Sequence, residues 1–210
     1  MFIIWGWRAV KALLGTGTFY CPRCQGDRCY RHFAARRWFT LFFIPMIPLK
    51  ALGSYVECDV CHGTFVEPVL EAPTVAQFEH ALGLATRAAA AHLVSRLSPT
   101  ADVVSQGVAA LADRAGVAQP YAENRLRADV AAFADQQTAL HYLAPLATTM
   151  SIDGREDFVR RLVVLGAQLA PADRMNEPIA AMASELQLSA AHLAGIREQV
   201  QAWSQTGGPA

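Results

Sequence analysis

Residues 21–61, "CPRCQGDRCYRHFAARRWFTLFFIPMIPLKALGSYVECDVC", begin and end with a Cys-x-x-Cys pair. A Cys-x-x-Cys turn directs both of its sulfurs toward one point, so two such turns supply the four thiolates of a tetrahedral zinc site. The pairs are separated by 33 residues, more than the roughly 15–20 of short zinc modules. A β-hairpin that returns to the same end accommodates the extra residues between the two pairs. The stretch therefore predicts a zinc site formed by Cys21, Cys24, Cys58 and Cys61.

The chain between the two pairs has the character of β-strands. A strand region is predicted over "DRCYRHFAARRWFTLFFI", residues 27–44, and a proline-rich corner over "PMIP", residues 45–48. The chain then returns through "GSYVECDV", residues 53–60. This order predicts a hairpin that brings the second Cys-x-x-Cys pair back to the first.

Zinc is the first choice of metal, because four soft ligands suit it, and iron fits the same ligands less commonly. The alternative is a pair of disulfides or a redox dithiol. Two pairs, an odd fifth cysteine and no signal peptide favour a reduced cytosolic metal site. Four thiolates leave no open coordination position, so the predicted site is structural rather than catalytic. The remaining donors nearby are interpreted as ordinary residues: Cys29, His32 and His62.

The most apolar run of the chain, "WFTLFFIPMIPL" at residues 38–49, is interrupted by two prolines. It is too short to span a bilayer, which takes roughly 20 apolar residues. The start, "MFIIWGWRAVKALLG", lacks the basic region and cleavage site of a secretory signal. Its aromatic and basic residues would suit a peripheral membrane anchor: Phe2, Trp5, Trp7, Arg8 and Lys11. Burial as core strands is the favoured interpretation of both segments.

The segment from Met1 to about Glu67 resembles small bacterial zinc-ribbon proteins. The resemblance rests on "MFIIWGW", the "CPRC" pair, "RWFTLFFIPMIPL" and the "CDVC" pair, which occur together and in this order. It implies that the four paired cysteines are the zinc ligands. It also implies that the apolar run belongs to the ribbon, as a core or docking strand.

From Pro73 onward the apolar residues recur with the spacing of helices. Seven helices are expected. The first begins after a capping box of Thr74 and Gln77, the second covers 101–116, the third covers 123–133, and the fourth covers 140–150 with a kink or fresh start at Pro145. The fifth begins at a cap of Asp153 with Glu156, the sixth has Pro178 in its first turn, and the seventh begins at a cap at Ser189. The fold class is therefore α+β in two domains. A zinc ribbon is predicted over 1–72, an all-α bundle of about seven helices over 73–204, and a flexible tail over 205–210.

Residues 143–196 resemble the TerB-like helical domain of the tellurite-resistance family. In that family, acidic residues at helix starts are implicated in divalent metal binding. The equivalent turn here reads "PADRMNEP", with Arg174 directly after Asp173 and with Glu177 displaced to the position before Pro178. An arginine opposes a cation by like charge, so transfer of a second metal site to Asp173 and Glu177 is not favoured.

Catalysis finds little support, because no P-loop, nucleophile elbow, zinc-protease or dinucleotide-binding motif is present. The formal net charge is zero, with eight Lys/Arg and four Asp/Glu in residues 1–70 and an acidic remainder. This distribution is a modest indication of an interaction surface and falls short of a typical DNA-binding domain. The expected protein is therefore not an enzyme.

The favoured hypothesis is a cytoplasmic zinc-binding adaptor that binds a partner protein through Trp38, Phe42 and Ile44. A role in stress or tellurite response, or in a larger assembly, is what the TerB-like resemblance implies. One alternative is a peripheral subunit docked on a membrane complex at the inner face of the membrane. The other is a nucleic-acid-binding ribbon, because basic and aromatic residues interleave in "DRCYRHFAARRWF".

Overall fold

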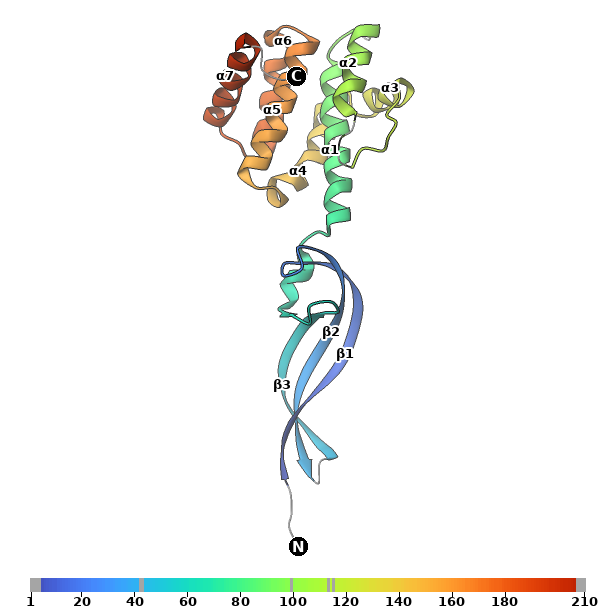
Figure 1. Ribbon diagram of the computed structural model, residues 1–210, viewed down its shortest axis with the longest axis vertical. Coiled ribbons are helices and arrows are strands. Elements are labelled where there is room, and N and C mark those ends of the chain that lie inside the picture. The colour runs from blue at the N-terminus through green and yellow to red at the C-terminus, as the bar shows by residue number, and fades with distance from the viewer. Residues whose placement is uncertain (1–4, 42–43, 99, 113, 115, 207–210) are drawn as a thin grey trace. The chain divides into compact units, whose positions relative to one another are not determined.

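The computed structural model describes residues 5–41, 44–98, 100–112, 114 and 116–206. The chain divides into two compact units, Met1–Gln77 and Phe78–Ala210. A four-stranded antiparallel sheet comes first and seven α-helices follow in the described residues, which confirms the α+β class (Figure 1). The predicted domain bounds at residues 72 and 204 stay predictions.

The sheet unit consists of β1 (Trp5–Cys21), β2 (Gly26–Leu41), β3 (Ile44–Cys58) and the short β4 (Thr64–Phe65), in that order across the sheet. A 3₁₀ turn, η1 (Glu67–Glu71), follows β4. The predicted hairpin is confirmed, because β2 and β3 pair from Leu41↔Ile44 to Tyr30↔Cys58. Figure 1 shows the three long strands coiling around one another along their length.

The proline-rich corner predicted at residues 45–48 is wrong, because these residues lie inside β3. Trp38 faces Pro48 and Thr40 faces Pro45, with a shift of register between Phe39 and Thr40. Proline cannot donate to a ladder and is tolerated on edge strands and at irregularities. β3 is such an edge over this stretch, since β4 pairs only with Val56 and Glu57.

The core of the sheet unit is small. Its buried members are Phe19, Cys21, Val56 and Cys58. Half-buried apolar side chains pack around them: Cys24, Tyr30, Cys61, Phe65, Val69 and Leu70. The core thus lies at the end of the sheet that carries the cysteines.

The opposite end of the sheet, which we call the arm, comprises residues 5–14 of β1, 33–41 of β2 and 44–55 of β3. The described residues of both apolar segments lie in strands here, as expected, but the expected burial is wrong for the exposed side chains among them. Ile44, Met46 and Ile47 are 55–60% exposed, and Trp38 and Phe39 are half-buried. Three strands form a single layer, and no second layer of the described sheet unit packs on this end.

The helices are α1 (Val75–Ser95), α2 (Ala101–Leu111), α3 (Glu123–Ala132), α4 (Gln136–Thr149), α5 (Ile152–Leu169), α6 (Ala172–Glu185) and α7 (Ala190–Thr206). Together they enclose a large apolar core, in which the fully buried leucines are Leu93, Leu111, Leu126, Leu143, Leu146 and Leu186. No helix in the described residues has both the length and the apolar character needed to cross a membrane.

Two of the predicted caps are confirmed. The Thr74 amide donates to Gln77 Oε1 at 2.9 Å, and the Gln77 amide donates to Thr74 Oγ1 at 3.2 Å. The His192 amide donates to Ser189 Oγ at 3.4 Å at the start of α7. The first turn of α1 has a further acceptor, because Asp27 takes hydrogen bonds from the amides of Val75, at 2.8 Å, and Ala76, at 3.3 Å.

Several other expected helix limits need correction. Ser151 caps α5 in place of Asp153, because its Oγ accepts from the Gly154 amide at 3.2 Å. α6 begins directly after Pro171, so Pro178 lies inside the helix rather than in its first turn. α4 begins earlier than residue 140, because Asp135 provides a cap and accepts from the Thr138 amide at 2.8 Å.

The ends of two helices also differ from the prediction. α2 ends at Leu111, before Gly116, which has a left-handed backbone with φ of 72°. α7 continues to Thr206, so residues 205 and 206 of the predicted tail are helical. The remainder of that tail, residues 207–210, lies outside the described residues.

Candidate metal centre

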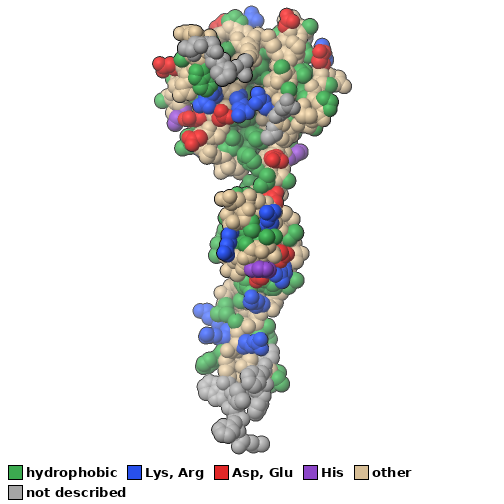
Figure 2. All heavy atoms as spheres, viewed as in Figure 1, with side chains coloured by type: hydrophobic (Ala, Val, Ile, Leu, Met, Phe, Trp, Pro, Cys, Tyr) green, Lys and Arg blue, Asp and Glu red, His purple; other side chains and the backbone are tan. Residues whose placement is uncertain are grey.

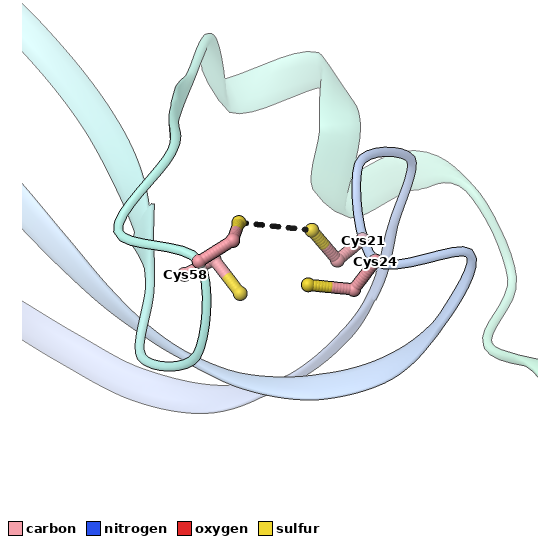
Figure 3. A group of neighbouring side chains, drawn as sticks. Cys21, Cys24 and Cys58 are labelled. Atoms are coloured by element: carbon pink, nitrogen blue, oxygen red, sulfur yellow. Dashed lines mark hydrogen bonds between the residues drawn. The ribbon is translucent and has the colours of Figure 1, made fainter.

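Two loops at one end of the sheet carry the paired cysteines. Cys21 is the last residue of β1, and Cys24 lies in the turn that leads to β2. Cys58 is the last residue of β3, and Cys61 lies in the turn that leads to β4. Figure 3 shows Cys21 and Cys24 on one loop facing Cys58 on the other. The antiparallel register brings the two loops together, as the hairpin predicts.

The sulfur positions have the dimensions of a four-thiolate metal site. The four Sγ atoms all lie within 4.8 Å of one another, and Cys21 Sγ is 3.8 Å from Cys61 Sγ. A tetrahedron with Zn–S bonds of about 2.3 Å has S···S edges of about 3.8 Å. The four cysteines therefore fit one structural zinc ion.

The disulfide alternative does not fit the cysteines. All five are free thiols, and the 3.8 Å that separates Cys21 Sγ from Cys61 Sγ is far longer than a disulfide bond of about 2.05 Å. Two members of the cluster, Cys21 and Cys58, are fully buried and belong to the core.

The two turns share a left-handed residue at the same position. Gln25 and His62, each directly after the second cysteine of its pair, have left-handed φ angles of 52° and 53°. In the second turn, the His62 amide donates to the Cys58 carbonyl at 3.0 Å, and the Cys58 amide donates to the Gly63 carbonyl at 3.0 Å. Left-handed backbone costs a non-glycine residue roughly 1–2 kcal/mol, so each turn stores some strain.

The environment of the two turns shifts the pKa values of two of the thiols. Burial raises the pKa of Cys58, but the backbone N–H groups of Cys61 and Val60 point at its sulfur and outweigh burial, so the pKa falls to about 7. Burial, together with hydrogen bonds from the neighbouring thiols, raises the pKa of Cys24 to about 12. A divalent cation at the centre reverses such penalties, because it favours four thiolates.

Bound zinc would supply a cross-link between the two turns. The chain's own contribution is to hold four sulfurs around one point and to exclude water by burying Cys21 and Cys58. Four sulfur ligands complete a tetrahedron, so no position remains for a water or a substrate. The arrangement supports structural rather than catalytic chemistry.

The other donors near the cluster have separate environments. Cys29 is exposed, and its carbonyl accepts from the Asp59 amide at 3.0 Å. His32 Nε2 contacts Glu67 Oε1 at 2.6 Å, and the side chain of His62 is 70% exposed. In the part of the chain that the structure describes, the four paired cysteines are the only metal-capable group of three or more.

Asp173 and Glu177, to which transfer of a second metal site was not favoured, lie on α6. Glu177 is 3.7 Å from Arg96 and forms an ion pair with it. Asp173 and Glu177 line a shallow surface cavity together with Ser95, Arg96, Gln136 and Arg174. The cavity thus contains two carboxylates and two guanidinium groups.

The comparisons with known proteins agree with this geometry. A zinc-ribbon family model matches residues 19–71, which include both Cys-x-x-Cys turns, β2, β3, β4 and η1. The searches of curated proteins and of solved structures return no match to this chain. The match to the zinc-ribbon family covers a minority of the chain and leaves the helices without a counterpart.

Two features of the site escaped the sequence interpretation. The turns share the pattern Cys-x-x-Cys-x-Gly, as "CPRCQG" and "CDVCHG", and this repetition marks the left-handed residues Gln25 and His62. The full length of β1 was also missed. An antiparallel partner of similar length to β2 is the signal for it, because Trp5 pairs with Leu41 and Cys21 pairs with Gly26.

Proposed function

We propose that this protein is a non-enzymatic zinc-binding interaction module, in which the zinc-stabilised ribbon presents the arm to a partner. One observation carries the proposal: the arm exposes large apolar side chains that the core of its own unit leaves uncovered. Their exposed fractions run from 43% to 61% for Trp7, Leu13, Leu14, Ile44, Met46, Ile47, Leu49 and Leu52. Large exposed apolar side chains gathered at one end of a sheet point to an interaction site.

The contact surface predicted from the sequence, Trp38, Phe42 and Ile44, overlaps the exposed apolar part of the arm. Ile44 is exposed and Trp38 is half-buried, whereas Phe42 lies outside the described residues. Met46 and Ile47 are further members of the same exposed stretch. Covering the exposed parts of Ile44, Met46 and Ile47 would contribute about 2–4 kcal/mol to binding.

The helical unit is proposed to be the assembly or effector-binding part of the adaptor. Its resemblance to the TerB-like domain supports a role in stress or tellurite response. A cavity of about 270 Å³ between α1, α2 and α5 is lined by apolar side chains such as Leu82 and Phe158. Arg114, Arg161 and Asp157 also line it, and Arg161 pairs with Asp157 at 2.6 Å, so the cavity would suit a small, mainly apolar ligand.

Nucleic-acid binding has weaker support. Arg31 is engaged within the ribbon by Glu57, at 3.2 Å, and by Asp59, at 2.7 Å. Tyr30 packs edge-to-face on Phe19 in the core. These groups are therefore occupied rather than available for phosphates and bases, and the exposed aliphatic side chains of the arm suit phosphates poorly.

The double change Ile44→Ser and Ile47→Ser tests the proposal. A docking surface requires that this variant keep one zinc ion per chain and the parent's thermal unfolding, while it loses its association with cellular partners or membranes in fractionation. Loss of zinc and of sheet structure would show instead that the arm is internal to the fold. Leu193→Ala, a core change in the helical unit, is the contrasting control that should lower stability and leave the zinc content unchanged.

A further inference from the structure

The charges of the arm are all of one sign. Residues 5–14, 33–41 and 44–55 contain no Asp or Glu and five basic residues: Arg8, Lys11, Arg36, Arg37 and Lys50. Lys11 is partly engaged, because its Nζ lies 3.9 Å from Glu57 Oε2 and 5.3 Å from the centre of the Tyr55 ring. The other four are exposed and form no ion pair within the described residues.

The strand register places these four cations in one band across all three strands. Arg8 faces Trp38, and the next pairs along the ladder are Ala9↔Arg37 and Val10↔Arg36. Arg36 in turn faces Ala51 of β3, the neighbour of Lys50. Figure 2 shows Lys and Arg side chains, in blue, beside hydrophobic side chains, in green, on this end of the sheet unit. We call these residues the cationic band.

On the side of the band toward Leu41 and Ile44 the sequence carries no charged side chain. Neither residues 1–7 nor residues 38–49 contain a charged side chain, and we call residues 5–7, 38–41 and 44–49 the tip. Thr40, the one hydroxyl side chain of the tip, is 8% exposed and donates to the Gly6 carbonyl at 3.1 Å. The exposed described side chains of the tip are thus apolar or aromatic.

We infer that the tip binds the surface of a lipid bilayer that contains anionic lipids, an inference that rests on the proposed docking role of the arm. An apolar tip bordered by tryptophans and by a cationic band matches the layers of such a surface: acyl chains, then the interface, then the phosphates. Trp7 and Trp38 border the tip next to Arg8 and Arg37.

The depth of the tip agrees with this arrangement. From Trp38 to Leu41 the strand advances three residues, or about 10 Å at roughly 3.3 Å each. Interfacial segments bury their apolar groups by about 5–10 Å. With the tip at that depth, Arg36 and Arg37 reach the phosphates. Because the edges of β1 and β3 are unpaired and the hydrocarbon core does not tolerate unpaired backbone groups, the tip is expected to stay at the boundary between headgroups and acyl chains.

Other occupants fit less well. A partner strand that paired with the edge of β3 would find fewer hydrogen-bond donors there, because Pro45 and Pro48 carry no N–H. A second copy packed on the same surface would bring two cationic bands together. A nucleic acid would meet the band but would leave Ile44, Met46 and Ile47 without an apolar partner.

Co-sedimentation of the zinc-loaded 210-residue chain with lipid vesicles tests the inference. Binding is expected to vesicles of phosphatidylcholine with phosphatidylglycerol, and much weaker binding to phosphatidylcholine alone. The pair Arg36→Gln and Arg37→Gln should weaken binding about 30-fold, because each basic residue near an anionic surface contributes about a fivefold step. The tip pair Ile44→Ser and Ile47→Ser should weaken it at least tenfold.

The matched control is the pair Leu13→Ser and Leu14→Ser. Both leucines are 57% exposed and lie on the arm beyond the band, so vesicle binding should be retained. Equal binding of the tip pair and the parent, or equal binding to charged and neutral vesicles, overturns the inference. If the parent binds a protein or a nucleic acid but no vesicle, the lipid inference fails and the docking role stands. If the tip pair loses its zinc and its sheet, the docking role itself fails.

Discussion

The two units of this chain bury very different amounts of apolar surface. The helical unit encloses a cluster of buried residues that runs through all seven helices, from Ala85 on α1 to Ile196 on α7. The sheet unit buries four apolar residues, and two of them, Cys21 and Cys58, belong to the metal site. Small cores usually need a metal or disulfides to be stable. We therefore expect burial to stabilise the helical unit and the metal site to stabilise the sheet unit.

The largest expected effect follows from removing one ligand of the metal site. Cys58→Ser should release zinc and unfold the sheet unit, because binding of structural zinc contributes about 10–16 kcal/mol to the folding of small zinc domains. Metal analysis and circular dichroism measure both effects, and the helical signal should persist. Cys29→Ser is the control, since Cys29 is exposed and lies outside the cluster. A Cys58→Ser protein that keeps a full zinc complement would contradict the four-thiolate assignment.

The next effect lies in the helical unit and should leave zinc in place. A Cβ at Gly83 would lie 2.0 Å from the Gly116 carbonyl oxygen. Gly83→Ala should therefore lower the free energy of unfolding of the helices by about 3 kcal/mol or more, because backbone must move to admit the methyl group. Chemical denaturation followed by circular dichroism measures this loss.

Gly195→Ala on α7 is the matched control for Gly83→Ala. Apart from the adjacent backbone of α7 and the two neighbouring residues, no atom lies within 4 Å of the added Cβ there, so the change should stabilise the helix by up to about 1 kcal/mol. Similar effects of the two changes would show that Gly83 and Gly116 do not approach each other closely.

A buried ion pair in the helical unit gives a smaller, pH-dependent effect. Asp129 accepts from Arg87 Nε at 2.8 Å and also from the Tyr121 hydroxyl. Burial opposes its ionisation, but the hydrogen bonds from Arg87 and Tyr121 outweigh burial and hold the pKa of Asp129 below its usual value of 3.8. Asp129→Asn should lower the free energy of unfolding at neutral pH by about 1–3 kcal/mol.

The sign of the pH dependence follows from this lowered pKa. The contribution of Asp129 is fully present above the unfolded value of 3.8 and is lost as the pH falls through the lower folded value. As the pH falls below about 4, the free energy of unfolding should therefore decrease more for the parent than for Asp129→Asn. Denaturation at a series of pH values measures this difference. Asp102→Asn, at an exposed carboxylate on α2, is the control and should follow the parent.

The smallest expected effect returns to the ribbon. His62→Gly should relieve the left-handed backbone at φ of 53° and slow the loss of zinc to a chelator. The gain is limited to about 1 kcal/mol, because glycine also loses more entropy on folding. Val60→Gly, at an exposed position of the same turn, should speed zinc loss instead. Faster loss from both variants would show that the turn needs a side chain at residue 62.

The sequence was sufficient for the site and for the order of elements, but not for burial. Cys21, Cys24, Cys58 and Cys61 were predictable because ligand type and spacing are local properties. The exposure of Ile44, Met46, Ile47 and Leu49 was not predictable. An apolar strand is expected to be covered, but its sequence does not say whether its own domain or a partner covers it. Pro178 was misplaced for a related reason, since the packing of α6 admits a buried proline inside the helix.

The hydrogen bonds from the first turn of α1 to Asp27 are expected to couple zinc binding to the formation of that helical turn. Asp27 follows the first cysteine pair by three residues and holds the amides of Val75 and Ala76. An ion that orders the turn around Cys24 should therefore protect the Val75 and Ala76 amides from hydrogen exchange. By thermodynamic reciprocity, a change that stabilises the first turn of α1 should raise the affinity for zinc by the same factor. Hydrogen exchange at Val75 and Ala76 should accordingly slow on zinc addition in the parent and respond less in Asp27→Ala.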